Sequence, residues 1–343
     1  MERTIFGKTG LTVSRTGFGG IPIQRVSFDE STALLRHAYE HGVTLYDTAN
    51  SYTTSEERIG IALHHVRDKI VICTKSKAIS PDEVMKNIEN SLRMLQTDHV
   101  DVFQAHNPPF IPRPGGEDGV YECMLKAKEQ GKIRHIGITS HSLDRARDAV
   151  LSGLYDTVQY PLSYISTDKE LALIDLCREH NMGVLAMKAL CGGLLTNVKA
   201  AFAFLRQYGN VVPIWGMQRM SELEEFLAYE KNPPLLDASL LKTVEADKAE
   251  LSVNFCRSCG YCMPCPSGIQ IPTAARITFL LRRSRKERHF TEEWQNNMRH
   301  IDNCTGCGHC KAHCPYGIDT PKLLKRQQAE YFEMLAAEMS GTK

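Results

Sequence analysis

Short apolar runs alternate with amphipathic helical segments along the first two thirds of the chain. After each run, apolar residues recur at the three-to-four-residue period of a helix. With the glycine-rich TGFGG counted as the first strand, the pattern predicts eight strand–helix units. The predicted strands are TGFGG (16–20), TLYDTA (44–49), IVICTKS (70–76), VDVFQAH (100–106), IRHIGITS (133–140), TVQYPL (157–162), GVLAMKA (183–189) and VVPIWG (211–216).

Regular alternation of strands and helices predicts an α/β fold whose parallel sheet has right-handed crossovers. Eight units suit a closed (β/α)8 barrel of the TIM type. An open doubly wound sheet is the alternative, and it is disfavoured because no GxGxxG follows the first strand. Residues 1–20 contain two short apolar patches among glycines, which predict a hairpin ahead of that strand.

The pattern changes at Asn232-Pro233-Pro234, where strands cease and a helical run leads toward a cysteine-rich tail. We therefore predict a barrel over residues 1–232 and a small, mostly helical domain over residues 233–343. Eight of the twelve cysteines lie after residue 255. This clustering indicates metal ligation rather than disulfides.

Two cysteine runs carry the tail's chemistry. The first, CRSCGYCMPCP, contains Cys256, Cys259, Cys262 and Cys265; the second, CTGCGHCKAHCP, contains Cys304, Cys307, Cys310 and Cys314. The second has the C-x2-C-x2-C-x3-C-P spacing of bacterial ferredoxins, and the first is one residue shorter. This spacing predicts two [4Fe–4S] clusters. Two zinc sites are the alternative, disfavoured because zinc usually takes well-separated CxxC pairs.

The fourth cysteine of each run ligates the other cluster in two-cluster ferredoxins. One cluster would then take Cys256, Cys259, Cys262 and Cys314, and the other Cys304, Cys307, Cys310 and Cys265. The helical surroundings resemble the helical ferredoxin domains that are fused to reductases.

Composition excludes several classes of partner. Lys and Arg total 41 against 40 Asp and Glu, so a bulk nucleic-acid or anionic-membrane partner is not expected. No apolar run follows a basic N-terminus, and none approaches the length of a membrane span. Reduced thiols in a chain without an export signal predict a cytoplasmic protein.

Four titratable side chains are expected at one rim of the barrel. Asp47 closes the second strand, and Tyr52 lies in the loop after it; Lys75 closes the third strand and His106 the fourth. Strand ends of this kind meet at the carboxyl face. We expect Asp47 to hold Lys75 by an ion pair and Lys75 to lower the pKa of Tyr52. His106 would orient a substrate carbonyl.

The chain resembles the aldo-keto reductase family over about residues 1–230. The resemblance rests on IFGKTGLTVSRTGFGG (5–20), LYDTANSY (45–52), ICTKS (72–76), VDVFQAHNP (100–108), GKIRHIGITSHS (131–142) and VQYPLSY (158–164). It implies a catalytic tetrad of Asp47, Tyr52, Lys75 and His106, in which Tyr52 is the general acid. It also implies NADPH or NADH extended across the barrel mouth.

The resemblance implies a set of cofactor contacts, namely Gly19, Gly20, Ser140, His141, Gln159, Met187, Gly216, Met217, Gln218 and Arg219. Ser140 and Gln159 would bind the nicotinamide carboxamide. Met187 stands where many members have an aromatic ring, and Arg219 could pair with a 2′-phosphate. The loop containing LLTNVKA (194–200) is shorter than the segment with which many members clamp the cofactor.

These features predict an NAD(P)H-dependent oxidoreductase that interconverts a small-molecule carbonyl and an alcohol. The clusters leave a question open, because hydride carries two electrons and a cluster normally passes one. They could serve a flavin, for which no motif is present, exchange electrons with a ferredoxin or other redox partner, or be structural. The alternatives are an electron-transfer adaptor with the barrel as scaffold, or an elimination or isomerisation with Tyr52 as base. The loop at 107–119 and Trp215 are candidates for the substrate pocket.

Overall fold

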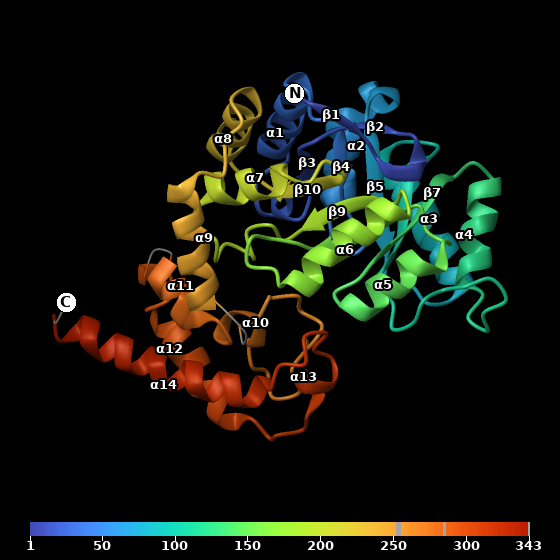
Figure 1. Cartoon of the computed structure of the whole chain (residues 1–343). Helices are drawn as coiled ribbons and strands as arrows, with labels where there is room; N and C mark the ends of the chain where they lie inside the picture. Colours follow the sequence, from blue (N-terminus) through green and yellow to red (C-terminus); the bar gives the residue numbers. More distant parts are fainter. Residues whose placement is uncertain (252–254, 284–285, 342–343) are drawn as a thin grey trace. The chain divides into compact units, whose positions relative to one another are not determined.

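The first part of the chain is a closed barrel of eight parallel strands (Figure 1). The computed structural model describes residues 1–251, 255–283 and 286–341. Neighbouring strands follow chain order from β3 to β10, and β10 closes the ring on β3. The predicted barrel is therefore confirmed, and an open sheet is wrong. The strands are β3 (Gly17–Gly19), β4 (Leu45–Asp47), β5 (Val71–Ser76), β6 (Val100–His106), β7 (Ile133–Thr139), β8 (Thr157–Pro161), β9 (Gly183–Met187) and β10 (Val211–Gly216).

A helix follows each barrel strand, and local sequence explains where these helices lie. In α3 the buried residues Val84, Ile88, Ser91 and Leu95 fall on one face, and Pro81 occupies the first turn, where its missing N–H is not needed. The helices are α1 (Phe28–Glu40), α2 (Ser55–Leu63), α3 (Pro81–Leu95), α4 (Val120–Glu129), α5 (Leu143–Ser152), α6 (Asp168–Glu179), α7 (Val198–Arg206) and α8 (Met220–Lys231).

The N-terminal hairpin fills the amino end of the barrel. Strands β1 (Arg3–Ile5) and β2 (Thr12–Ser14) pair antiparallel, as the sequence predicts. Phe6 and Val13 pack on interior residues near the starts of the strands, among them Leu45 and Val102. The amino end is thus a packed core, and the chemistry is left to the carboxyl end.

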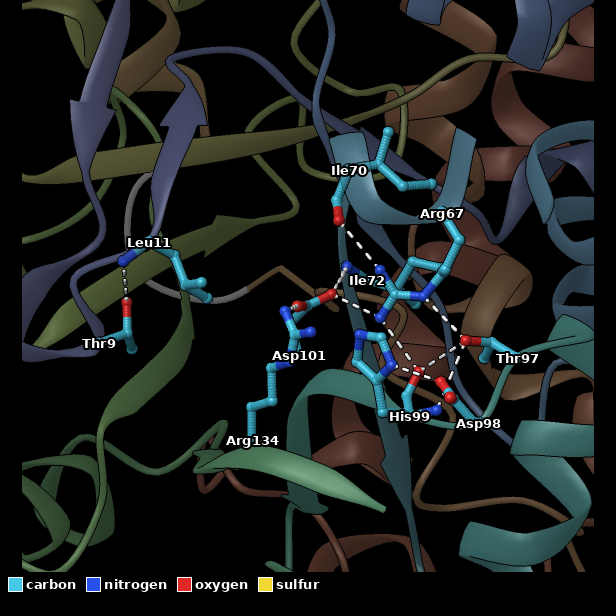
Figure 2. A network of polar contacts seen from close by, with 10 residues as sticks. All are labelled: Thr9, Leu11, Arg67, Ile70, Ile72, Thr97, Asp98, His99, Asp101 and Arg134. Carbon is cyan, nitrogen blue, oxygen red and sulfur yellow. Dashed lines mark hydrogen bonds and ion pairs between the residues drawn. The ribbon is translucent and has the colours of Figure 1, made fainter. Parts of the chain in front are cut away.

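A second buried feature of the amino end is the ion pair between Arg67 and Asp101 (Figure 2). Arg67 lies in the short helix η3 (His64–Lys69), and its Nη2 is 2.7 Å from Asp101 Oδ2. The same carboxylate oxygen accepts from the Ile72 backbone N–H at 2.9 Å, and Oδ1 accepts from Arg134 at 3.1 Å. This network ties η3 to β5, β6 and β7.

The remainder of the chain forms a second compact unit, which comprises Leu190–Val198 and Leu241–Lys343. The sequence boundary at residues 232 and 233 remains a prediction, whereas the structural division falls within α9. Its helices are α9 (Ala238–Leu251), α10 (Ile271–Ala274), α11 (Ile277–Arg283), α12 (Glu292–Arg299), α13 (His309–Ala312) and α14 (Thr320–Met339). The core contains Ile277, Met298 and Tyr331. Among the residues described here the unit has no strand, as expected.

No helix in the described ranges combines the length and the apolar character that crossing a lipid bilayer requires.

Candidate active site and cluster-binding residues

The carboxyl ends of β4, β5 and β6 bring three of the predicted catalytic side chains to one rim. Asp47 ends β4, His106 ends β6, and Lys75 is the next-to-last residue of β5. Lys75 lies opposite Gln104, two residues before His106. Because side chains alternate between the faces of a strand, these residues share the barrel interior. Tyr52 lies in the loop between β4 and α2.

Asp47 and Lys75 form a buried ion pair. Lys75 Nζ is 2.6 Å from Asp47 Oδ2 and donates to the Thr48 carbonyl at 2.7 Å. The two side chains are almost completely buried. Burial raises the pKa of Asp47, and the charge and hydrogen bond of Lys75 oppose that rise without cancelling it. The pair is therefore held in place at a desolvation cost.

Tyr52 and His106 lie beside this pair. Their ring centres are 6.1 Å apart in an edge-on arrangement, and Lys75 Nζ lies 5.2 Å from the centre of the Tyr52 ring. Burial lowers the pKa of His106 well below its usual range, and the charges of Lys75 and Lys77 lower it further. His106 is therefore neutral at pH 7. Its Nδ1 is buried and has no hydrogen-bond partner among the described residues.

The expectation that Lys75 lowers the pKa of Tyr52 is wrong. Burial raises the pKa of the half-buried Tyr52 phenol, and the negative charge of Asp47 raises it further. The physical reason is that the Lys75 charge, which Asp47 offsets in part at 2.6 Å, does not outweigh the desolvation of the phenol and the negative charge of Asp47. Tyr52 therefore stays protonated at neutral pH, as a proton donor must.

Gln104 is a rim residue that the sequence analysis missed. It is fully buried on β6, and its Nε2 is 3.4 Å from Asp47 Oδ1. Gln159, on β8, approaches Asp47 Oδ2 in the same way at 3.4 Å. Neither side-chain oxygen has a partner in the described part of the chain. Strand alternation could have identified Gln104, because it lies two positions before His106 on the same face of β6.

Asn107 was missed as well, although it organises the rim next to His106. It has a φ of +51°, which Asn tolerates better than most residues. Its backbone N–H donates to Thr139 Oγ1 at 2.9 Å, and its Oδ1 accepts from the His141 N–H at 2.9 Å. Asn107 thereby joins the end of β6 to the loop after β7.

The predicted nicotinamide contacts gather at the ends of β7, β8 and β9. The Ser140 N–H donates to the Gln159 carbonyl at 3.0 Å, and both side chains are buried. His141, which follows Ser140 in the chain, is also buried. Met187 ends β9 and packs, half-buried, on the interior core. The structure therefore brings these four residues to the same end of the barrel.

Gly19 and Gly20 have packing reasons of their own. A Cβ on Gly20 would lie 2.6 Å from Ser55 Oγ, and one on Gly19 would lie 3.2 Å from the Trp215 carbonyl oxygen. The Gly20 N–H donates to the Asp47 carbonyl at 2.8 Å. These glycines allow α2 and β10 to approach the first strand closely, and their contact with a nucleotide remains a prediction.

The predicted adenosine site follows β10. Gly216 is exposed, whereas Met217 is fully buried, so any nucleotide contact from Met217 would involve its backbone. The backbone N–H groups of Gln218 and Arg219 donate to Glu222 Oε2 at 2.8 and 3.2 Å. Arg219 Nη1 also lies 3.6 Å from Glu222 Oε1. The carboxylate of Glu222 therefore already satisfies the groups that a 2′-phosphate would use.

Trp215 does not line the barrel interior. It is 1% exposed and stacks on Phe202 and Phe226, with ring centres 6.2 and 4.6 Å away. Phe202 and Phe226 belong to α7 and α8, outside the sheet. Its candidacy for the substrate pocket is therefore wrong, because strand alternation in β10 points Ile214 inward and Trp215 outward.

The second unit contains two cysteine-lined cavities. The first is lined by Cys265, Cys304, Cys307 and Cys310. The second is lined by Cys256, Cys259, Cys262 and Cys314, with Cys310 at its wall. In the described ranges, no three or more Cys, His, Asp or Glu side chains form a group that could hold a single metal ion. The grouping supports the crossed ligand sets that the spacing predicts.

The surroundings of these thiols fit an iron–sulfur cluster. The Ser258 N–H donates to Cys256 Sγ at 3.4 Å, from a turn in which Ser258 has a φ of +50°. Burial raises the pKa of Cys262 to about 12, so ionisation needs the positive charge that iron supplies. His309 lines the other cavity, and its buried Nε2 has no partner among the described residues.

Comparison with known proteins gives two family matches. The profile of the aldo/keto reductase family matches residues 15–201, and that of a 4Fe-4S dicluster domain matches residues 255–319. The latter agrees with the predicted iron–sulfur clusters.

Individual relatives cover the barrel. An aldo-keto reductase of Bacillus subtilis, YhdN, is 30% identical over 57% of this chain and 64% of its own length, so the chain spans somewhat less than two thirds of that relative. The L-galactose dehydrogenase of Arabidopsis thaliana is 32% identical over 57% of this chain and 67% of its own. An aldo-keto reductase from Klebsiella pneumoniae in complex with NADPH has the same fold, with a TM-score of 0.59 at 23% identity over 72% of this chain and 95% of that one.

Proposed function

This chain belongs to the aldo/keto reductase family, and on that premise we propose that it is an oxidoreductase that interconverts a small-molecule carbonyl and an alcohol. The observation that carries the proposal is the buried Asp47–Lys75 pair beside Tyr52 and His106 at the carboxyl rim. A binding scaffold has no need of a buried ion pair next to a protonated phenol and a neutral imidazole.

Tyr52 would protonate the carbonyl oxygen in the reducing direction. Its raised pKa keeps the proton on the phenol, and neutral His106 can donate a hydrogen bond that orients the same oxygen. Lys75, fixed by Asp47, stabilises the tyrosinate that forms when the proton leaves. The raised pKa also disfavours the alternative reaction in which Tyr52 acts as a base at neutral pH.

A nicotinamide nucleotide would supply hydride at this rim. Ser140, His141, Gln159 and Met187 would hold the nicotinamide end, and the unpartnered Gln159 oxygen is suited to accept from a carboxamide. Gly19 and Gly20 would let the backbone approach the nucleotide closely. Residues 216–219 would contact its adenosine end.

Replacing Tyr52 tests the catalytic part of the proposal. Tyr52→Phe should lower kcat for NAD(P)H-dependent reduction by about 100-fold or more across a panel of small aldehydes and ketones. Tyr39→Phe, which removes a phenol hydroxyl from α1, is the matched control and should keep full activity. Undiminished turnover in Tyr52→Phe would show that Tyr52 is not the proton donor. A wild-type protein that is inactive on the whole panel would favour the alternative that the barrel is the scaffold of an electron-transfer adaptor.

Glu222 tests the choice of nucleotide. Its carboxylate would repel a 2′-phosphate and already engages Arg219, so Glu222→Gln should shift the preference toward NADPH over NADH. The expected change in the ratio of the two Kd values is about fivefold, or roughly 1 kcal/mol. Glu225→Gln, on the same helix, is the control. An unchanged ratio would show that Glu222 does not face the phosphate.

We further propose that the eight cysteines hold two [4Fe–4S] clusters in the crossed arrangement, which would supply single-electron transfer. A ferredoxin or another one-electron carrier would be the partner. Adding a reduced one-electron carrier anaerobically to the reconstituted chain tests this role, because each cluster takes up one electron. Bleaching of the visible absorbance is expected, and an unchanged spectrum would contradict it. A reducing compartment such as the cytoplasm suits these thiols.

A further inference from the structure

The segment Leu190–Val198 lies between β9 and α7 in the chain, yet it belongs to the second compact unit. Three consecutive residues in it have positive φ: Cys191 at +49°, Gly192 at +66° and Gly193 at +89°. A left-handed conformation at a residue other than glycine is unfavourable unless its surroundings hold it. The segment begins three residues after Met187, so whatever holds it acts close in sequence to the predicted cofactor contact.

Arg276 is one of the residues that hold this segment. It lies between α10 and α11, is 8% exposed, and donates through Nη1 to the Cys191 carbonyl and through Nη2 to the Gly192 carbonyl, both at 3.1 Å. A Cβ on Gly192 would lie 2.9 Å from Arg276 Nη1. Glycine at position 192 thus makes room for the guanidinium.

Among the described residues, no carboxylate forms an ion pair with the Arg276 guanidinium, and its Nε has no hydrogen-bond partner there. A buried cation without a counter-charge is costly. Cys256 and Cys191 both act electrostatically on Arg276, and its neighbour Ala275 lines the cavity of Cys256, Cys259, Cys262 and Cys314. Four thiolates and their cluster would supply the missing anion.

We propose that Arg276 is a positioning residue that couples the cluster of Cys256, Cys259, Cys262 and Cys314 to the segment 190–198. Its positive charge stabilises the reduced cluster, and the loaded cluster in turn keeps the guanidinium on the two carbonyls. The segment after the seventh barrel strand is thereby held in place by an iron–sulfur site. This inference rests on the cluster assignment in the proposed function and is independent of the carbonyl chemistry.

Arg283 offers a matched comparison. It also holds the segment, because its Nη1 donates to the Leu194 carbonyl at 3.0 Å. Its charge, however, is balanced by Asp247 at 2.7 Å and by Glu250. Arg283 should therefore fix the segment without acting on the cluster.

A redox titration followed by electron paramagnetic resonance, on the reconstituted full chain, tests the electrostatic half. In Arg276→Gln one of the two midpoint potentials should become more negative, because reduction adds negative charge that the guanidinium no longer offsets. The midpoint potential of the other cluster should not change. Arg276→Lys keeps the charge and should retain both wild-type midpoints, and Arg283→Gln should retain both as well.

Hydrogen exchange of peptides covering residues 190–198 tests the mechanical half. In the wild type, cluster loading should slow exchange there by about tenfold. Loading should have no such effect in Arg276→Gln, and a weaker one in Arg276→Lys, because an ammonium cannot reach both carbonyls as a fork does. If Arg276→Gln fails to load clusters, Arg276→Lys becomes the test variant. In Arg276→Lys the protection of residues 190–198 on cluster loading should weaken while both midpoint potentials stay unchanged.

Two results would overturn the inference alone: unchanged midpoints in a loaded Arg276→Gln, or the same midpoint shift in Arg283→Gln. A wild-type protein that shows no cluster absorbance after reconstitution would overturn the cluster assignment along with it.

Discussion

Two buried ion pairs lie at opposite ends of the barrel, and their surroundings differ. At the amino end, the Asp101 carboxylate accepts from Arg67, Arg134 and the Ile72 N–H at 2.7 to 3.1 Å (Figure 2). Arg67 donates in addition to the Ile70 and His99 carbonyls at 3.0 Å. Both carboxylate oxygens of this pair have close donors.

At the carboxyl end, Asp47 has one close side-chain donor, Lys75 at 2.6 Å, and two distant ones, Gln104 and Gln159 at 3.4 Å. The oxygens of both glutamines and Nδ1 of His106 have no partner among the described residues. Buried polar groups are normally satisfied, so the exceptions need an explanation. At the amino end His99 Nε2 is likewise without a partner among the described residues, but both oxygens of Asp101 have close donors. We therefore propose that the amino-end pair stabilises the fold, whereas the rim pair belongs to a site that ligands would complete.

The largest effect should come from removing the rim cation. Lys75→Met should lower kcat by about 1,000-fold, because Tyr52 then has no ammonium to stabilise its anion. The free energy of unfolding should fall less than is usual when a buried ion pair loses one partner. The reason is that Asp47, whose pKa is already raised, takes up a proton. Steady-state kinetics together with thermal unfolding measures both. Near-normal turnover in a folded Lys75→Met would show that the rim pair is not needed for catalysis.

At the amino end we expect the opposite result, a large loss of stability with little loss of activity. Arg67→Met leaves Asp101 buried without its main counter-charge and should cost about 3–5 kcal/mol in the free energy of unfolding. Activity per folded molecule should remain, because Arg67 lies outside the rim. Urea unfolding and kcat at saturating substrate check the two parts, and a kcat loss comparable to that of Lys75→Met would show that the two ends are not functionally separate.

The sequence predicted the barrel and the tetrad because both depend on local order along the chain. Apolar runs mark strands, and parallel strands present their ends at one face, so Asp47, Lys75 and His106 could be brought together without a structure. The two cysteine ligand sets are predicted from spacing and stay predictions. Gln104 could have been found by continuing the alternation backward from His106.

Other features depend on three-dimensional charge balance and could not be predicted. The pKa of Tyr52 is raised because the phenol is buried and lies near the negative charge of Asp47, and spacing along the chain reveals neither the burial nor that proximity. Trp215 is a candidate for the pocket in the sequence, but alternation within β10 turns it toward α7 and α8. The assignment of residues 190–198 to the second unit depends on Arg276 and Arg283, which lie more than 80 residues away in the chain.

A smaller effect is expected from Gln104, which contacts Asp47 only at 3.4 Å. Gln104→Leu removes one distant donor to Asp47 and should lower kcat by about tenfold, with little loss of stability because an unpartnered oxygen disappears with it. Thr157→Val is the control, since Thr157 Oγ1 is also buried and unpartnered within the described chain but has no bond to Asp47. Equal kcat losses in the two variants would mean that general packing, and not the contact with Asp47, matters.

The smallest effect concerns pH and arises from the buried histidine at the rim. Because the pKa of His106 is lowered on folding, the unfolded chain binds a proton there that the folded chain does not. The stability this contributes is fully present above the unfolded pKa of about 6.5 and is lost as the pH falls below it. Thermal unfolding at pH 7.5 and 5.5 should show a smaller drop for His106→Gln than for the wild type. His65→Gln, on the exposed surface of η3, should follow the wild type. A His106→Gln drop equal to that of the wild type would show that the rim histidine is not held neutral by its surroundings, and the contrast between the two ends would then depend on the unpartnered glutamine oxygens alone.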